Sequence, residues 1–426
     1  MGRTRRGIVD VFVGLTLGCT GTAPADPGTI SGTDGSSPTV GASGADASGG
    51  TAVGDAGTSS SSAMDSTSGD ASSSGGSALP SSTSDASSGA EPPGLSPEEQ
   101  AAVDDNWALR ETRAIEAWQL VRARGREPGE GVLIAQPDTG ASPHPELQPS
   151  SDGHSPLRWD LARDFVDGDD DPQHGFDNPL MLPAHGHGTE TSSVIVSPLG
   201  CPLAGSNEMP CVTGAAPAAS VVPLRISDTV VLVSGDTAAA AVDYAVDIGA
   251  HVISISMGGV TPMPALEAAI ENARAAGIIV VAAAGNGTGI IVVAPSTFDG
   301  VVCVAGITPD IEPWSTSARG PRVDISGPAV DVRYARVTEQ GGALTYGIGL
   351  AQGTSDATAL TASAAALWLS YHGRDALLER YGAAGIPVVF RSLLTEYGVS
   401  VPPRWPESNW GSGVLDMVAL LEAPLP

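Results

Sequence analysis

The stretch GVLIAQPDTG (residues 131–140) decides the fold of this chain. Its first six residues form an apolar run, and a turn sequence follows directly, which is typical of a buried strand. Similar short runs rich in Val and Ile cover residues 220–226, 251–257, 278–283 and 301–304. Parallel strands that are covered on both faces read as near-continuous apolar runs, so we predict a parallel sheet.

Helical patterns alternate with these runs. Small and apolar residues recur at the spacing of one helical face in two segments. They are Ala238, Ala241, Val242 and Ala245, then Leu266, Ala269, Ile270 and Ala273. Further helical stretches cover residues 113–124, 187–196 and 362–369. We therefore predict an α/β fold, a three-layer sandwich with a mostly parallel central sheet flanked by helices. In such sheets ligands bind beyond the carboxyl ends of the strands, where Asp138 and Asn286 stand.

The N-terminal part has a different composition. Three arginines precede an apolar run that is too short to span a bilayer and that ends at Cys19, so residues 1–19 are predicted to be an export signal. The segment Leu15–Cys19 resembles a bacterial lipoprotein cleavage site, which predicts lipidation of Cys19. An ordinary signal peptide, which would release a secreted protein, is the alternative. Residues 20–98, rich in Ser, Gly, Ala and Asp, are predicted to be a disordered tether, and residues 99–426 one folded domain.

Charge restricts the partners. The chain has 426 residues and a formal net charge of −28, which argues against nucleic acids and anionic lipid surfaces as partners. We expect a monomer that reaches a membrane only through the lipid anchor. All 20 basic residues are arginines, so a serine–lysine catalytic dyad is excluded.

The remaining cysteines divide into a pair and a single residue. Cys201 and Cys211 flank one loop and are predicted to form a disulfide in an oxidising compartment. Cys303 lies inside an apolar run and is predicted to be a buried free thiol. No cysteine spacing resembles a zinc site, and no metal ligands are assigned.

Four residues supply what acyl transfer at an amide requires. These requirements are a nucleophile, a base, a group that orients the base, and donors for the oxyanion. Ser355, His187, Asp138 and Asn286 match them in that order. Taken singly, Asp138 could merely end a strand in a common turn, and Ser355 could be only a helix cap.

The motifs around these residues resemble those of the subtilisin family. Asp-Thr-Gly at Asp138, His-Gly-Thr at His187 and Gly-Thr-Ser-x-Ala at Ser355 match its three catalytic boxes in chain order. The resemblance extends from about Trp107 to Asp416. It implies a serine endopeptidase that acts on proteins or peptides and requires no cofactor, with Asn286 and the Ser355 backbone N–H as oxyanion donors. An inactive subtilisin-fold surface module that binds peptides or partners is the alternative.

The resemblance also implies where substrate binds. Ser256, Met257, Gly258 and Gly259 resemble the segment whose backbone pairs with substrate as an added strand. Ala284 and Gly285 precede Asn286 in the oxyanion box. Val293 and Ala294 align where the family lines its specificity pocket, which implies a pocket for small or medium apolar side chains.

Three positions depart from the family pattern. Asp356 replaces a usual Met, Ala359 a usual Pro, and Glu190 a usual His. We expect an ionised Asp356 to stabilise the protonated imidazole of His187. The alternative is that Asp356 only favours the start of a helix.

The acidic stretch at residues 164–171 admits a structural calcium ion, which the family often uses. The EF-hand pattern fails there, because Pro172 stands in place of the needed glycine. A solvated acidic loop is therefore the favoured interpretation.

Overall fold

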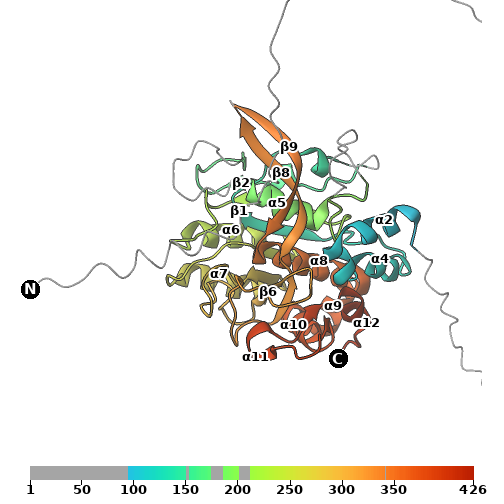
Figure 1. The fold of residues 1–426 in the computed structure, drawn as a ribbon. Helices are drawn as coiled ribbons and strands as arrows, with labels where there is room; N and C mark the ends of the chain where they lie inside the picture. Colours follow the sequence, from blue (N-terminus) through green and yellow to red (C-terminus); the bar gives the residue numbers. More distant parts are fainter. Residues whose placement is uncertain (1–94, 150–152, 174–185, 201–211, 341) are drawn as a thin grey trace, which may run out of the picture. The chain divides into compact units, whose positions relative to one another are not determined.

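The computed structural model describes residues 95–149, 153–173, 186–200, 212–340 and 342–426 (Figure 1). Cys19, Cys201 and Cys211 lie outside these residues, as do the export signal and nearly all of the tether, so those predictions stay untested. In the described ranges no helix is long and apolar enough to cross a membrane.

The described chain begins with helix α2 (Pro97–Asp105). Ser96 caps it, because its hydroxyl accepts from the Glu99 N–H while the Glu99 carboxylate accepts from the Ser96 N–H. The first helix therefore starts two residues before the boundary predicted at residue 99.

Nine strands of the described residues form one sheet, in the order β10-β11-β7-β6-β5-β4-β1-β3-β2. They are β1 (Leu133–Asp138), β2 (Arg163–Asp164), β3 (Ser220–Arg225), β4 (Val252–Ile255), β5 (Ile279–Ala283), β6 (Val302–Ile307), β7 (Ile325–Pro328), β10 (Val399–Ser400) and β11 (Val414–Leu415). Every neighbouring pair is parallel except β10 and β11 at the edge. The prediction of a mostly parallel sheet is confirmed.

The strand order places the site. Strand β1 pairs with β3 on one side and with β4 on the other, so the chain adds strands first to one side of β1 and then to the other. Such a switch point opens a crevice beyond the carboxyl ends of the strands. Asp138 ends β1 there, and Ser256 directly follows β4.

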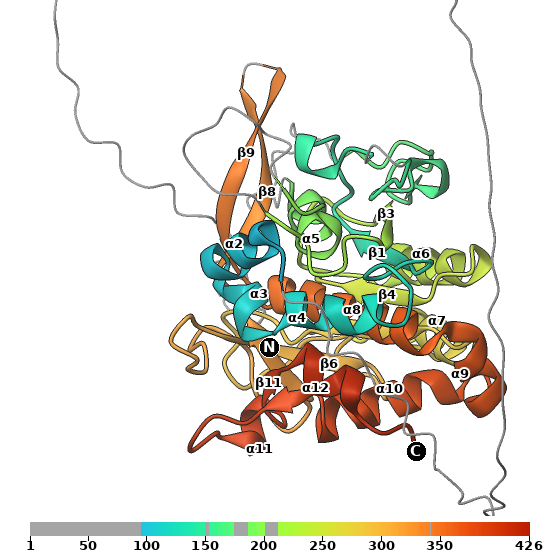
Figure 2. The same cartoon turned by 90° about the vertical axis from the view of Figure 1, so that its right-hand side faces the viewer.

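Helices cover both faces of the sheet (Figure 1, Figure 2). Helices α6 (Asp236–Asp247) and α7 (Pro264–Ala275) cover one face. Helices α5 (His187–Val196) and α8 (Thr354–His372) cover the other. The remaining helices are α3 (Trp107–Glu111), α4 (Ala114–Arg122), α9 (Arg374–Tyr381), α10 (Gly385–Glu396), α11 (Glu407–Trp410) and α12 (Met417–Glu422).

Successive side chains of each strand point alternately into two hydrophobic cores. On β4, Val252 belongs to the core beneath α8, whereas Ile253 belongs to the core beneath α6 and α7. This is the period of two that a strand imposes on its side chains. Both faces are apolar, which explains why the strands appear in the sequence as continuous apolar runs.

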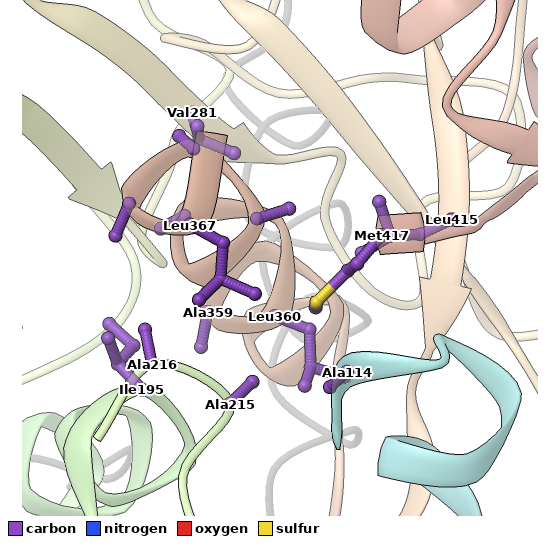
Figure 3. Packing of buried hydrophobic residues seen from close by; sticks show 14 of the residues in the cluster. Ala114, Ile195, Ala215, Ala216, Val281, Ala359, Leu360, Leu367, Leu415 and Met417 are labelled. Atoms are coloured by element: carbon purple, nitrogen blue, oxygen red, sulfur yellow. The ribbon is translucent and has the colours of Figure 1, made fainter. Parts of the chain in front are cut away.

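Helix α8 is the centre of the larger core. Its residues 354–370 are all buried. Figure 3 shows Leu360 and Leu367 of α8 among side chains that other elements contribute, including Ile195 of α5, Val281 of β5 and Met417 of α12. No side of α8 along these residues faces solvent, because the sheet and the surrounding helices enclose the helix.

A long hairpin was not predicted from the sequence. Strands β8 (Val330–Gln340) and β9 (Ala343–Gln352) pair with each other alone, and they extend away from the layers in both views (Figure 1, Figure 2). The base of β9 leads directly into Gly353, the residue before α8. The hairpin therefore directly precedes the helix that carries Ser355.

Candidate active site

Three predicted residues, distant in the sequence, converge at one point. The Nδ1 atom of His187 lies 2.7 Å from Oδ1 of Asp138, and its Nε2 atom lies 3.0 Å from Oγ of Ser355. Asp138 ends β1, while His187 and Ser355 lie in the first turns of α5 and α8. All three side chains are buried, with exposed fractions of 1–2%.

Neighbouring groups fix the Asp138 carboxylate. The Thr139 N–H donates to Oδ1 at 2.6 Å, and the Thr191 hydroxyl lies 3.4 Å from Oδ2. Thr191 stands four residues after His187 on α5, and its hydroxyl also donates to the His187 carbonyl. The sequence analysis missed Thr191, although the spacing of four residues places it on the same helical face as His187.

Asn286 reaches the same place from the loop after β5. Its Oδ1 atom accepts from both the N–H and the hydroxyl of Thr354, each at 3.0 Å. These two bonds fix the oxygen end of the amide, so the nitrogen is the end that can donate to an oxyanion. Thr354 was also missed by the sequence analysis, because its partner lies 68 residues away.

The sequence agrees with a family of known proteins. A model of the subtilase family of S8 peptidases matches residues 129–381, which is more than half of the chain. The chain belongs to the subtilase family. Its sequence is 31% identical over 265 residues to thermitase of Thermoactinomyces vulgaris, covering 62% of this chain and 81% of thermitase. It is 29% identical over 239 residues to subtilisin Savinase of Lederbergia lenta, covering 56% of this chain and 76% of Savinase.

A solved structure supports the same fold. A protease from Pseudoalteromonas arctica superimposes with a TM-score of 0.60 at 22% identity, covering 75% of this subtilase and 97% of that protease. The family match shows that this chain is a subtilisin-like serine protease. The prediction from the three motifs is thereby confirmed at the level of family and reaction.

The predicted substrate segment lies beside the nucleophile. The Ser355 hydroxyl is 3.3 Å from the Ser256 carbonyl oxygen, and the Ser256 hydroxyl donates to the Ser355 carbonyl at 3.2 Å. The backbone of Gly258 bonds to Val230 and Leu232. Gly259 bridges to Ala294, so the segment is held from both sides.

A small pocket adjoins Ser355 in the subtilase. Its lining includes Met257, Gly258, Gly285, Val293 and Ser355. The side chain of Val293 is 2% exposed and packs against Gly258 and Gly285 so closely that a Cβ added at Gly258 would overlap it. The predicted residue Ala284 is fully buried and does not line this pocket.

Two of the departures from the family pattern lie within this site. Glu190 follows His187 by one helical turn on α5, and Asp356 follows Ser355 on α8. Burial raises the pKa of Glu190 to about 7. Burial also raises the pKa of Asp356 well above its ordinary value, and the negative charge of Glu190 adds to this shift. The buried carboxyl thus favours its neutral form, which argues against the expected ionised Asp356.

The acidic stretch of the subtilase is partly neutralised by arginine. Arg225 forms ion pairs with Asp164, Asp167 and Asp228, and Arg163 pairs with Asp170. In the described ranges no group of three or more acidic, His or Cys side chains is arranged to hold a metal ion. The calcium interpretation of residues 164–171 stays a prediction.

Cys303 is a buried free thiol, as the sequence predicts. It lies in β6, and burial raises the pKa of its thiol to about 12. A thiol in this state is inert, so Cys303 takes no part in the site.

Proposed function

We propose that this subtilase cleaves peptide bonds through an acyl-enzyme on Ser355, with His187 as the base, Asp138 as its orienting partner and Asn286 as an oxyanion donor. The observation that carries the proposal is the pair of hydrogen bonds that links Asp138, His187 and Ser355 at 2.7 and 3.0 Å. The proposal selects an active enzyme over an inactive peptide-binding module.

The geometry defines the steps. Oγ of Ser355 attacks the substrate carbonyl carbon while its proton passes to Nε2 of His187. The Asp138 carboxylate accepts from Nδ1 and stabilises the resulting imidazolium. The C–N bond then breaks, the amine leaves with the proton from His187, and the acyl group stays on Ser355. Water attacks this ester, gives a proton to His187, and the proton returns to Ser355 as the acid leaves.

The oxyanion would be held by two donors. They are the Asn286 side-chain amide and the backbone N–H of Ser355, which lies at the start of α8. A helix N-terminus also favours negative charge. Such donors stabilise the transition state more than the substrate, because the charge develops only during attack.

The pocket favours a small residue on the acyl side of the cleaved bond. Val293 packs against Gly258 and Gly285, so its side chain fills space between two glycine backbones beside Ser355. We infer that Gly, Ala and Ser are accepted there and that Leu and Phe are rejected. The partners are thus proteins or peptides with small residues at the cleavage site.

The location is proposed from the sequence. Residues 1–19 would direct export, lipidation of Cys19 would anchor the protein at the cell envelope, and residues 20–98 would tether the domain. Labelling with a radioactive fatty acid tests this anchor. Label on the full chain that is lost in Cys19→Ser supports it, whereas label on both chains or on neither contradicts it.

A peptide library tests the activity. The purified protein is incubated with peptides of mixed sequence beside Ser355→Ala, and the cleavage sites are read by mass spectrometry. Cleavage after small residues by the wild type alone is expected. Equal cleavage by Ser355→Ala would reject the assignment.

A further inference from the structure

Two buried carboxyl groups that subtilase chemistry does not require act electrostatically on the catalytic imidazole. Glu190 and Asp356 are 8% and 0% exposed. No other described residue donates a hydrogen bond to either oxygen of Asp356, whose carboxyl meets only the N–H of its own backbone. A buried carboxyl that no other residue stabilises costs free energy, so its presence next to Ser355 calls for a functional explanation.

The packing of two helices brings the pair together. Glu190 lies one turn after His187 on α5, and Asp356 lies in the first turn of α8. Helices α5 and α8 pack against each other, and each carboxyl is within the electrostatic reach of His187. The first turns of both helices therefore contribute one catalytic residue and one acidic residue to the same buried volume.

Few other charges act on this pair. They are Asp138 from β1 and His187 from α5, together with the mutual repulsion of the two carboxyls. No arginine of the described residues compensates either group, and β8, which also packs on α5, contributes no charge to them. With Asp138, three carboxyls thus act on one imidazole.

These surroundings restrict how the pair can ionise. Two neighbouring buried carboxyls without a cation do not both ionise near neutral pH, because desolvation and mutual repulsion oppose the second charge. Asp356 is the more deeply buried, and no other described residue donates to its oxygens. It therefore retains the shared proton, while Glu190 changes charge.

We propose that Glu190 and Asp356 form a pair that holds one proton. Asp356 stays neutral, and Glu190 is the positioning residue that sets the pH at which His187 becomes a base. This inference rests on the proposed function, since it assigns the base to His187. As pH rises, the Glu190 carboxylate appears and stabilises the imidazolium of His187. The enzyme then needs a higher pH to free the base than it would without Glu190.

The acid limb of the pH profile of kcat/KM tests this assignment. In Glu190→Gln the limb is expected to move to lower pH by about one unit, the size of shift that a nearby opposite charge produces. In Asp356→Asn the limb should stay in place, because the residue it replaces is already neutral. Glu271→Gln, an exposed position on α7, is the control for loss of a distant charge. An unmoved limb in Glu190→Gln, or an equal shift in Asp356→Asn, would overturn the proposal.

A measurement without turnover separates this inference from the proposed function. The carboxyl carbons of full-length Ser355→Ala, labelled with ¹³C, are followed by NMR across pH. Glu190 should titrate near pH 7, where burial places its pKa, and Asp356 should stay protonated through this range. Titration of both carboxyls below pH 5 would reject the pair even if the enzyme is active. The expected titrations in a protein without peptidase activity would instead reject the proposed function alone.

Discussion

At the scale of single residues, Asn286 is the sharpest test of the oxyanion site. Its amide oxygen is fixed by Thr354, so its nitrogen should serve the transition state and not the substrate. Asn286→Ala is expected to lower kcat by about 10²–10³ with little change in KM, the size known for the corresponding asparagine of subtilisin. Steady-state kinetics beside Asn272→Ala, an exposed position on α7, provide the comparison. A decrease in kcat of less than about tenfold would contradict the role of Asn286 as an oxyanion donor.

Val293 tests the proposed limit on substrate size. Removing its side chain in Val293→Gly opens the space next to Gly258 and Gly285. We expect kcat/KM for a peptide with Phe before the cleaved bond to rise by at least about tenfold relative to the matched Ala peptide, since each buried methylene is worth roughly 0.8 kcal/mol. Both peptides are measured with both enzymes. An unchanged ratio of the two values would show that another residue limits the pocket.

The catalytic triad and Asn286 could be predicted from the sequence because each residue stands in a short motif. The residues that hydrogen-bond to them and fix their positions could not. Thr354 and Thr191 act through partners brought close by the fold, at separations of 68 and 53 positions. Likewise, Glu190 and Asp356 each appear in the sequence as an isolated departure from a pattern. Their positions in the motifs place each near a catalytic residue, but only the packing of α5 on α8 shows that they act on each other.

At the scale of the elements, the contact between α5 and the end of β1 positions His187. Gly188 in α5 lies so close to the Gly140 carbonyl that any side chain would overlap it. Gly188→Ala should therefore push the first turn of α5 away from Asp138 and stretch the bond between His187 and Asp138.

We expect this substitution to lower kcat by about 100-fold or more and stability by about 1–3 kcal/mol. Kinetics and urea unfolding measure the two effects. Gly347→Ala on β9 is the control, because the nearest atom to an added Cβ there is the end of the flexible Arg336 side chain. Full activity in Gly188→Ala would show that the close contact does not position His187.

The strands differ in how well they could be predicted from the sequence. Strands β1, β3, β4 and β5 were predicted to within about two or three residues, because they are apolar on both faces. The β8–β9 hairpin was missed because its strands are not continuous apolar runs: β8 buries Val332, Tyr334, Ala335 and Val337 between polar residues, and β9, which is mostly exposed or half-buried, contains two glycines. Strands β2, β10 and β11 have two residues each and are too short to show a period.

At the scale of the whole molecule, charge dominates. The formal net charge of −28 implies strong mutual repulsion among the acidic side chains at low ionic strength. Salt shortens the Debye length from about 30 Å at 0.01 M to about 10 Å at 0.1 M. We expect the urea midpoint of full-length Ser355→Ala, which avoids autolysis, to rise between these two NaCl concentrations. A fall in the midpoint would show that the arginine ion pairs outweigh the repulsion.

The hydrogen bonds that link Asp138, His187 and Ser355 predict that the Ser355 hydroxyl is activated. Treatment with a fluorophosphonate, followed by tandem mass spectrometry of the digested protein, tests this most directly. A single modified residue, Ser355, is expected, with labelling abolished in His187→Ala and in Ser355→Ala. Labelling at another residue, or no labelling of a folded wild-type protein, would contradict it.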